Sequence, residues 1–111
     1  MNYKVDSIPL FDKQAKRLAK KYPSLKNDLG KLINSLSENP DQGTSLGNGF
    51  FKIRISITSK GKGKSGGGRV ITYVKIVANT VFLSSIYDKA EKATISNKEL
   101  EQIFKSLLPG Q

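Results

Sequence analysis

The stretch Phe51-Lys52-Ile53-Arg54-Ile55-Ser56-Ile57 decides the fold, because apolar and polar side chains alternate along it with a period of two. Such alternation is typical of a strand with one face on a core and the other toward solvent. A continuous β-branched and aromatic run follows at residues 70–77 and is typical of a central strand. A further strand is expected at residues 81–87, after a turn at residues 78–80. The centre of the chain therefore predicts three consecutive strands.

Three amphipathic helices are predicted around these strands. The first is expected to begin with Ser7 as its N-cap and to end before Pro23. Ser24 can cap the second, whose apolar stripe runs from Leu25 to Leu36. A capping-box sequence at residues 96–99 opens a third helix near the C-terminus. Together the first two helices predict a helical hairpin that precedes the sheet.

The order of elements indicates the α+β class. A short strand at residues 2–5 precedes the helical hairpin, and a loop is expected at residues 41–49. We expect an antiparallel twisted sheet packed against the N-terminal helical hairpin, with a C-terminal helix. The length of 111 residues allows one domain over 1–111, and 37% hydrophobic residues supply one modest core. No apolar run approaches bilayer length, so we expect a cytoplasmic protein without membrane contact.

The chain contains no cysteine and no histidine. Disulfides, Cys/His metal sites, cysteine nucleophiles and triads that need imidazole are therefore excluded. Any acid–base chemistry must use Lys, Tyr, Asp or Glu, and Arg is available to stabilise charge. We expect neither a metal nor another cofactor.

The formal net charge of +10 indicates a polyanionic partner, and nucleic acid is the leading candidate. An acidic protein or an anionic lipid surface would be attracted as well. No acidic residue lies between Asp41 and Asp88. An ordinary exposed strand face would mix both signs of charge. The same span holds only basic charged residues, namely Lys52, Arg54, Lys60, Lys62, Lys64, Arg69 and Lys75.

The glycine-rich loop at residues 59–68 contains two sequences that look like phosphate-binding motifs. Gly61, Gly63 and Gly66 match G-x-G-x-x-G, but a strand is predicted where the dinucleotide motif needs a helix. Residues 63–65 resemble the end of a P-loop, yet position 58 is Thr rather than Gly. Both nucleotide-binding interpretations are therefore rejected.

Three lysines in the same loop favour a different role. Lys60, Lys62 and Lys64 alternate with glycines, and cations on a flexible backbone suit contact with a phosphate backbone without sequence readout. The alternative is a solvated hairpin tip whose glycines only permit the turn. We predict that these three lysines bind RNA.

A candidate catalytic cluster lies at the base of this loop. Lys52 and Arg54 are two residues apart and so project from the same strand face, and Arg69 begins the next strand. If the two strands pair about the loop, the three cations meet, as suits phosphoryl chemistry. Tyr87-Asp88-Lys89 adds a phenol, a carboxylate and an ammonium at the end of the last strand. A tyrosine there is more often a packing residue, but beside a basic face it can stack on a base or transfer a proton.

These residues carry a resemblance to a known family. Residues 51–55, the loop at residues 59–69 and residues 86–89 resemble the RelE/ParE superfamily of bacterial toxins. The Ser-Lys-Gly-Lys-Gly-Lys loop followed by Gly-Gly-x-Arg is most similar to the HigB-like branch. The resemblance covers nearly the whole chain and implies a RelE-like fold. It also implies the toxin half of a type II toxin–antitoxin pair.

For activity, the resemblance implies a ribosome-dependent endonuclease that cleaves mRNA in the A site. The 2′-OH of a nucleotide would attack the adjacent phosphate and give a 2′,3′-cyclic phosphate and a free 5′-OH, with no metal required. Lys52 and Arg54 match the family's basic pair on the second strand, and Arg69 matches the arginine that opens the third. Arg54 and Arg69 would hold the phosphate oxygens.

The proton-transfer groups stay open in this comparison. Tyr87 and Lys89 fall in the region that supplies the last polar catalytic groups. Several family members use a histidine that this chain lacks, so the general base is Lys52, Tyr87 or Asp88. Either Lys89 or Tyr87 would protonate the leaving 5′-oxygen.

Two alternatives belong to other functional classes. A ParE-like toxin would bind DNA gyrase without catalysis, although such an inhibitor needs no cations clustered on a phosphate. An inactive chain would survive only as an antitoxin-binding module. In either toxin reading we expect a cognate antitoxin with an acidic segment, because it must cover a basic surface. The ribosome and A-site mRNA are the other expected partners.

Overall fold

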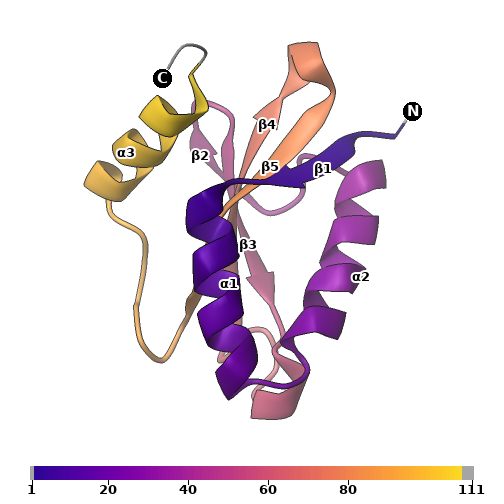
Figure 1. Ribbon diagram of the computed structural model, residues 1–111, viewed down its shortest axis with the longest axis vertical. Coiled ribbons are helices and arrows are strands. Elements are labelled where there is room, and N and C mark those ends of the chain that lie inside the picture. Colours follow the sequence, from indigo (N-terminus) through magenta and orange to yellow (C-terminus); the bar gives the residue numbers. More distant parts are fainter. Residues whose placement is uncertain (1, 109–111) are drawn as a thin grey trace.

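The computed structural model describes residues 2–108, which form one five-stranded sheet and three helices (Figure 1). The strand order across the sheet is β1-β5-β4-β3-β2. The strand bounds are β1 (Lys4–Ser7), β2 (Thr44–Gly47), β3 (Phe50–Ile55), β4 (Gly68–Lys75) and β5 (Thr80–Asp88). This arrangement confirms the α+β class and the three central strands.

The sheet is antiparallel except at one edge. Strand β1 pairs with β5 in parallel, with Lys4 opposite Thr80 and Ser7 opposite Leu83. Only strands joined by a short turn are forced to run antiparallel, and β1 is separated from β5 by the rest of the fold. We expected a wholly antiparallel sheet, but the observed sheet is mixed.

Strand β2 was not expected, because residues 41–49 read as a loop. Its sequence, Thr44-Ser45-Leu46-Gly47, has no apolar alternation, and it pairs with β3 from Thr44 opposite Lys52. The strand forms through hydrogen bonding to β3 rather than through burial of its own side chains. A polar edge strand of this kind leaves no periodic signal in the sequence.

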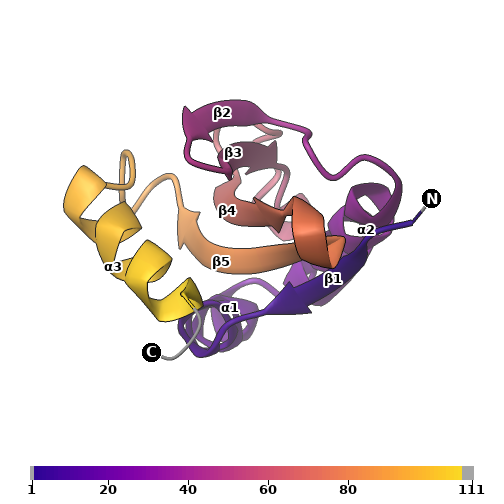
Figure 2. The same ribbon diagram turned by 90° about the horizontal axis from the view of Figure 1, so that it is seen from above.

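The helices are α1 (Pro9–Lys21), α2 (Leu25–Glu38) and α3 (Asn97–Leu107). Figure 2 shows α2 and α3 on opposite sides of the twisted sheet, with α1 alongside β5. The expected capping box is present, since Ser96 accepts from the Glu99 amide. Helix α1 begins one residue later than expected: Ile8 is its N-cap, and the Ser7 hydroxyl donates to the Asp12 carboxylate instead.

The main core lies between the helical hairpin and one face of the sheet. The apolar positions of α1 and α2 meet the inward-facing residues of β3, β4 and β5, as the alternation at residues 51–57 predicts. Fully buried members include Leu18, Leu25, Leu36, Ile57, Val70, Val81 and Ile86. No helix within residues 2–108 combines the length and the apolar character needed to cross a membrane.

Two short 3₁₀ helices mark the connections between the long strands. The first, η1 (Thr58–Lys60), begins the glycine–lysine loop between β3 and β4. The second, η2 (Ile76–Ala78), forms the turn between β4 and β5 and ends at Asn79, which has a φ of 48°. Strand β4 therefore stops at Lys75, two residues before the end of the run that predicts it.

Candidate functional site

The strand register brings the expected catalytic residues into one row. Arg54 of β3 lies opposite Arg69 of β4, and Arg69 lies opposite Tyr87 of β5. Side chains of directly opposed residues share a face of the sheet. Lys52 lies two residues from Arg54 and therefore also projects from this face. The structure thus brings Lys52, Arg54, Arg69 and Tyr87 together at one end of the sheet.

These four side chains differ in their access to solvent. Arg54 is exposed, and Lys52 is half-buried. Arg69 and Tyr87 each retain only 5% of their surface. In the described part of the chain, Arg54 makes neither an ion pair nor a side-chain hydrogen bond. Arg54 is therefore the cation of the row that can meet an incoming phosphate directly.

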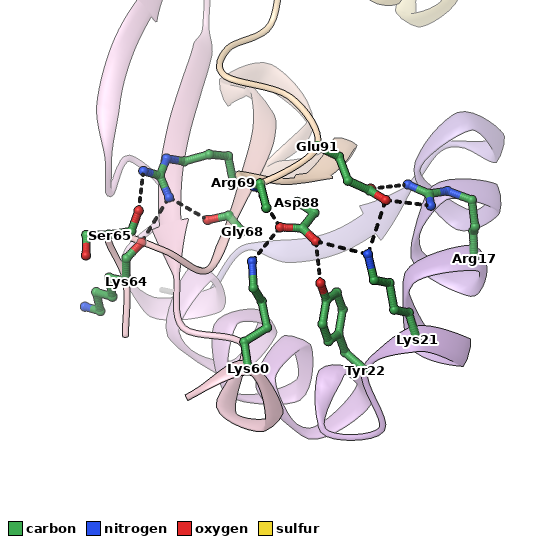
Figure 3. A network of polar contacts seen from close by, with 11 residues as sticks. Arg17, Lys21, Tyr22, Lys60, Lys64, Ser65, Gly68, Arg69, Asp88 and Glu91 are labelled. Carbon is green, nitrogen blue, oxygen red and sulfur yellow. Dashed lines mark hydrogen bonds and ion pairs between the residues drawn. The ribbon is translucent and has the colours of Figure 1, made fainter. Parts of the chain in front are cut away.

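Arg69 binds the main chain of the glycine–lysine loop. Its guanidinium donates to the carbonyl oxygens of Lys64 at 3.0 Å and Gly68 at 3.1 Å, and to that of Ser65 at 3.5 Å. Figure 3 shows these carbonyls gathered around the guanidinium, while the Lys64 side chain points away. The buried arginine thereby fixes the returning arm of the loop to the start of β4.

Lys60 departs from the expectation of three free lysines at the loop tip. Its side chain is 7% exposed, and its ammonium donates to the Asp88 carboxylate at 2.6 Å. Lys62 and Lys64 remain exposed, as expected. The loop therefore presents two lysines to solvent and uses the third as an internal tether.

Asp88 is the centre of a polar network at the end of β5 (Figure 3). Its buried carboxylate accepts from Lys60, from the Tyr22 hydroxyl at 2.5 Å and from the Ala90 amide at 2.9 Å. The ammonium of Lys21 lies 4.0 Å away. The carboxylate thus connects the end of α1, the start of the loop and the end of β5.

The network keeps Asp88 ionised. Burial alone would raise the pKa of this carboxyl, but hydrogen bonds from Lys60, Tyr22 and the Ala90 amide outweigh burial and hold the pKa at about 2. A carboxylate with so low a pKa and so many donors is a poor proton acceptor near neutral pH. Asp88 therefore fits a structural role better than that of the general base.

Tyr87 and Lys89 are also engaged within the fold. The Tyr87 hydroxyl is buried and has no hydrogen-bond partner among the described residues, and the Lys92 ammonium lies 5.4 Å from its ring centre. The Lys89 ammonium donates to the Ala93 carbonyl at 3.0 Å. The segment that follows β5 therefore covers the tyrosine, and access to it requires that segment to move.

Glycine is required where the loop rejoins the sheet. A Cβ at Gly67 would lie 2.1 Å from the Ile55 carbonyl oxygen, closer than any real contact. The Gly67 carbonyl also accepts from the Lys89 amide at 3.1 Å. The close approach places the loop directly against β3 and the end of β5, and the strand that follows confirms that the loop is no dinucleotide-binding motif.

Sequence reasoning missed the polar part played by the C-terminal end of α1. Neither Tyr22 nor Arg17 was among the predicted site residues, although Tyr22 donates to Asp88 at 2.5 Å and Arg17 pairs with Glu91 at 2.8 Å. Gln14 was also missed: its side-chain oxygen accepts from the Ile86 amide at 2.9 Å, beyond the end of β1. Each partner lies more than 60 residues away along the chain, so no local pattern could have found it. In residues 2–108 no three acidic side chains group as a possible metal site.

The sequence profile described as the RelE toxin of the RelE/RelB toxin–antitoxin system matches residues 10–107. The chain belongs to the RelE toxin family. No match was found among curated protein sequences. The profile spans the helical hairpin, strands β2 to β5 and α3, so the row of Arg54, Arg69 and Tyr87 lies within the matched region.

Solved structures show the same fold. A free E. coli RelE toxin carrying two arginine-to-alanine substitutions has a TM-score of 0.66 at 18% identity, covering 97% of this chain and 100% of that chain. The isolated E. coli RelE toxin has a TM-score of 0.59 at 19% identity, with coverages of 95% and 99%. The RelBE2 toxin–antitoxin complex of Mycobacterium tuberculosis has a TM-score of 0.58 at 16% identity, covering 81% of this chain and 94% of that chain.

Proposed function

We propose that this RelE-family toxin is a ribosome-dependent endonuclease that cleaves mRNA in the A site. The supporting observation is the exposed, unpaired Arg54 in a row with Arg69 and Tyr87, beside Lys52. An exposed arginine that makes no ion pair within residues 2–108 suits a phosphodiester in its transition state. We further propose a HigB-like toxin of the cytoplasm, on the strength of the loop at residues 59–69.

The reaction is a transfer of the phosphate from the 5′-oxygen to the 2′-oxygen. The base removes the 2′-OH proton, the 2′-oxygen forms a bond to the adjacent phosphorus, and the bond to the 5′-oxygen breaks. The products are a 2′,3′-cyclic phosphate and a 5′-OH, which takes up a proton. Arg54 stabilises the negative charge on the phosphate oxygens in the transition state.

The proton-transfer roles fall to fewer groups than the sequence allowed. Lys52 is half-buried on the face of Arg54, so it is our proposed base, with Tyr87 as the alternative once its cover moves. Lys89 or Tyr87 would supply the proton to the leaving oxygen. Asp88 holds the loop through Lys60, and Arg69 acts through the loop carbonyls.

A cognate antitoxin with an acidic segment would neutralise the toxin. The M. tuberculosis RelBE2 relative was solved as a toxin–antitoxin complex, and this chain carries a net charge of +10. Binding of an acidic segment over Arg54 and Lys62 would block RNA access. The affinity of the complex should fall as salt is raised, because exposed charge pairs are screened.

The test is to map mRNA 5′ ends after a short pulse of expression. Codon-positioned cuts bearing 5′-OH ends, lost in Arg54→Ala, are expected. DNA-damage signalling without cuts would support the ParE-like alternative of gyrase inhibition and overturn the proposal. Antitoxin binding without either effect would identify an inactive antitoxin-binding module and would overturn it too.

A further inference from the structure

We call the row of Arg54, Arg69 and Tyr87 the catalytic row. A second basic feature lies beside it, in a groove between α2 and the outer edge of β3. The groove has a volume of about 270 Å³. Three cationic side chains from three different elements line it: Lys31 from α2, Arg54 from β3 and Lys64 from the loop. We name this feature the α2 groove. It continues the row of Arg54 and Arg69 sideways, away from Tyr87.

The groove exists because β2 is short. Strand β2 pairs with β3 only as far as Lys52, so the outer edge of β3 from Ile53 to Ile55 has no strand beside it. Helix α2 lies next to this edge and contributes Lys31, Leu32 and Ser35. The lining combines polar and charged residues with the apolar Leu32, Ile53 and Ile55.

The positive charge of the α2 groove is available to a ligand. Within residues 2–108, Lys31, Arg54 and Lys64 form no ion pair. The one acidic residue in the lining, Asp28, already accepts from the Thr58 amide at 2.9 Å and the Thr58 hydroxyl at 2.6 Å. The lining thus holds three positive charges against one carboxylate whose oxygens are occupied.

Arg69 fixes the position of Lys64 in this groove. Arg69 donates to the Lys64 carbonyl, and the Lys64 side chain points away from the guanidinium (Figure 3). That side chain then lines the groove with Arg54. The buried arginine therefore couples the catalytic row to the groove through the loop backbone.

We propose that the α2 groove binds a phosphate of the RNA strand next to the phosphate that is cleaved, with Lys31 as a binding residue outside the catalytic row. This inference rests on the proposed function. Proteins that hold single-stranded RNA without sequence preference track its backbone with a positively charged groove. Arg54 belongs to both the row and the groove, so one strand can follow the path from one to the other.

An acidic peptide is the competing occupant, and the geometry favours RNA. A peptide that adds a strand to β3 needs an open edge of about five residues, the usual length of a strand. The open edge here runs only from Ile53 to Ile55. A phosphate needs no such length and is held by point charges.

The closing experiment compares Lys31→Gln with Lys26→Gln, an exposed lysine of the same helix that does not line the groove. The probe is a six-nucleotide 2′-O-methyl RNA, which cannot be cleaved because its 2′-oxygen carries no proton. The dissociation constant is measured against salt. Loss of one phosphate contact should reduce the slope of log K against log salt by about 0.7 in Lys31→Gln. The Lys26→Gln variant should keep the wild-type slope.

Cleavage of ribosome-bound mRNA by the same variants separates the two proposals. With Lys31→Gln, KM should rise several-fold while kcat stays within about twofold, since uniform binding is lost. If Lys31→Gln and Lys26→Gln have the same salt slope and the same KM, the proposed RNA binding in the α2 groove is overturned. The proposed cleavage activity is unaffected by that result. If Lys31→Gln weakens binding of the probe but the wild-type protein cleaves no mRNA, the proposed cleavage activity is overturned. The proposed RNA binding in the groove is then supported. Binding of a decaglutamate peptide is measured as well. If Lys31→Gln weakens peptide binding more than RNA binding, the proposal that the groove binds RNA is overturned.

Discussion

One face of strands β3, β4 and β5 carries two different surfaces. At one end, Phe50 and Tyr73 pack with Phe104 of α3, with ring centres 5.2 to 6.2 Å apart. At the other end the opposed residues are Arg54, Arg69 and Tyr87. The same alternation produces both, because Phe50 and Arg54 lie on the same face of β3.

The difference between the two ends comes from what covers them. Helix α3 lies over the aromatic end, where burial of rings stabilises the fold. The cationic end keeps Arg54 in solvent, since burial of an unpaired guanidinium would be costly. We infer that the aromatic end stabilises the fold and that the cationic end carries the proposed chemistry. Asp88, buried beside the cationic end, is the exception that tests it.

The largest effect is expected for Asp88→Ala. The substitution leaves the Lys60 ammonium and the Tyr22 hydroxyl without their buried acceptor, so the free energy of unfolding should fall by about 3–5 kcal/mol. Urea unfolding followed by circular dichroism measures the loss. The double variant Asp88→Leu with Lys60→Met should recover much of it, because both partners are then apolar. A single-variant loss below about 1 kcal/mol would show that the network adds little.

Arg54→Ala should affect cleavage rather than stability. Removal of one transition-state cation typically lowers kcat by about 100-fold, whereas an exposed side chain changes the free energy of unfolding by less than about 0.5 kcal/mol. Single-turnover cleavage on ribosomes and urea unfolding measure the two quantities. Lys75→Ala, at the far end of β4, is the matched control and should leave both unchanged. Equal rates for the two variants would refute the assignment.

Phe104→Ala should show the opposite pattern. Loss of a half-buried ring from the aromatic end should lower the free energy of unfolding by about 2 kcal/mol. The kcat of the folded protein should stay within about twofold, because the ring lies away from Arg54. The neighbouring Lys105→Ala is the control for unfolding. A large fall in kcat would break the proposed division between the two ends.

Acid should lower the free energy of unfolding by protonating Asp88. The pKa of Asp88 is lowered from 3.8 to about 2 in the folded chain, so its contribution is complete above about pH 4 and is lost as the pH falls toward 2. The loss should amount to about 2 kcal/mol. Urea unfolding between pH 5 and pH 2 measures it. Asp88→Asn should lack this component of the pH dependence, and an identical slope in both proteins would contradict the assignment.

The smallest effect is expected for Glu91→Gln. Glu91 pairs with Arg17 at 2.8 Å, and the hydrogen bond from Arg17 lowers the pKa of the Glu91 carboxyl. An exposed pair of this kind contributes little to the free energy of unfolding, and salt screens it. Thermal unfolding at low and high salt should show a small difference that disappears at high salt. A larger, salt-resistant loss would contradict the description of this pair as a solvent-screened surface contact.

The sequence predicts the central sheet and the helices well, because their periodicity reflects burial. Lys52, Arg54 and Arg69 could be grouped in advance, since alternation fixes their faces and the loop joins their strands. Strand β2 and the parallel pairing of β1 could not, because both depend on partners distant in the chain. The polar network had the same difficulty: Lys60 reads as a loop-tip lysine until Asp88 and Tyr22 are seen beside it.

The hold of Arg69 on the loop has a consequence for protein engineering. Its guanidinium binds carbonyl oxygens of residues 64, 65 and 68, and every amino acid supplies a carbonyl oxygen. The side chains at Lys62, Lys64 and Ser65 can therefore be exchanged without loss of the loop's anchor. A library randomised at these three positions would vary the charge that the loop presents to solvent while the loop backbone stays fixed.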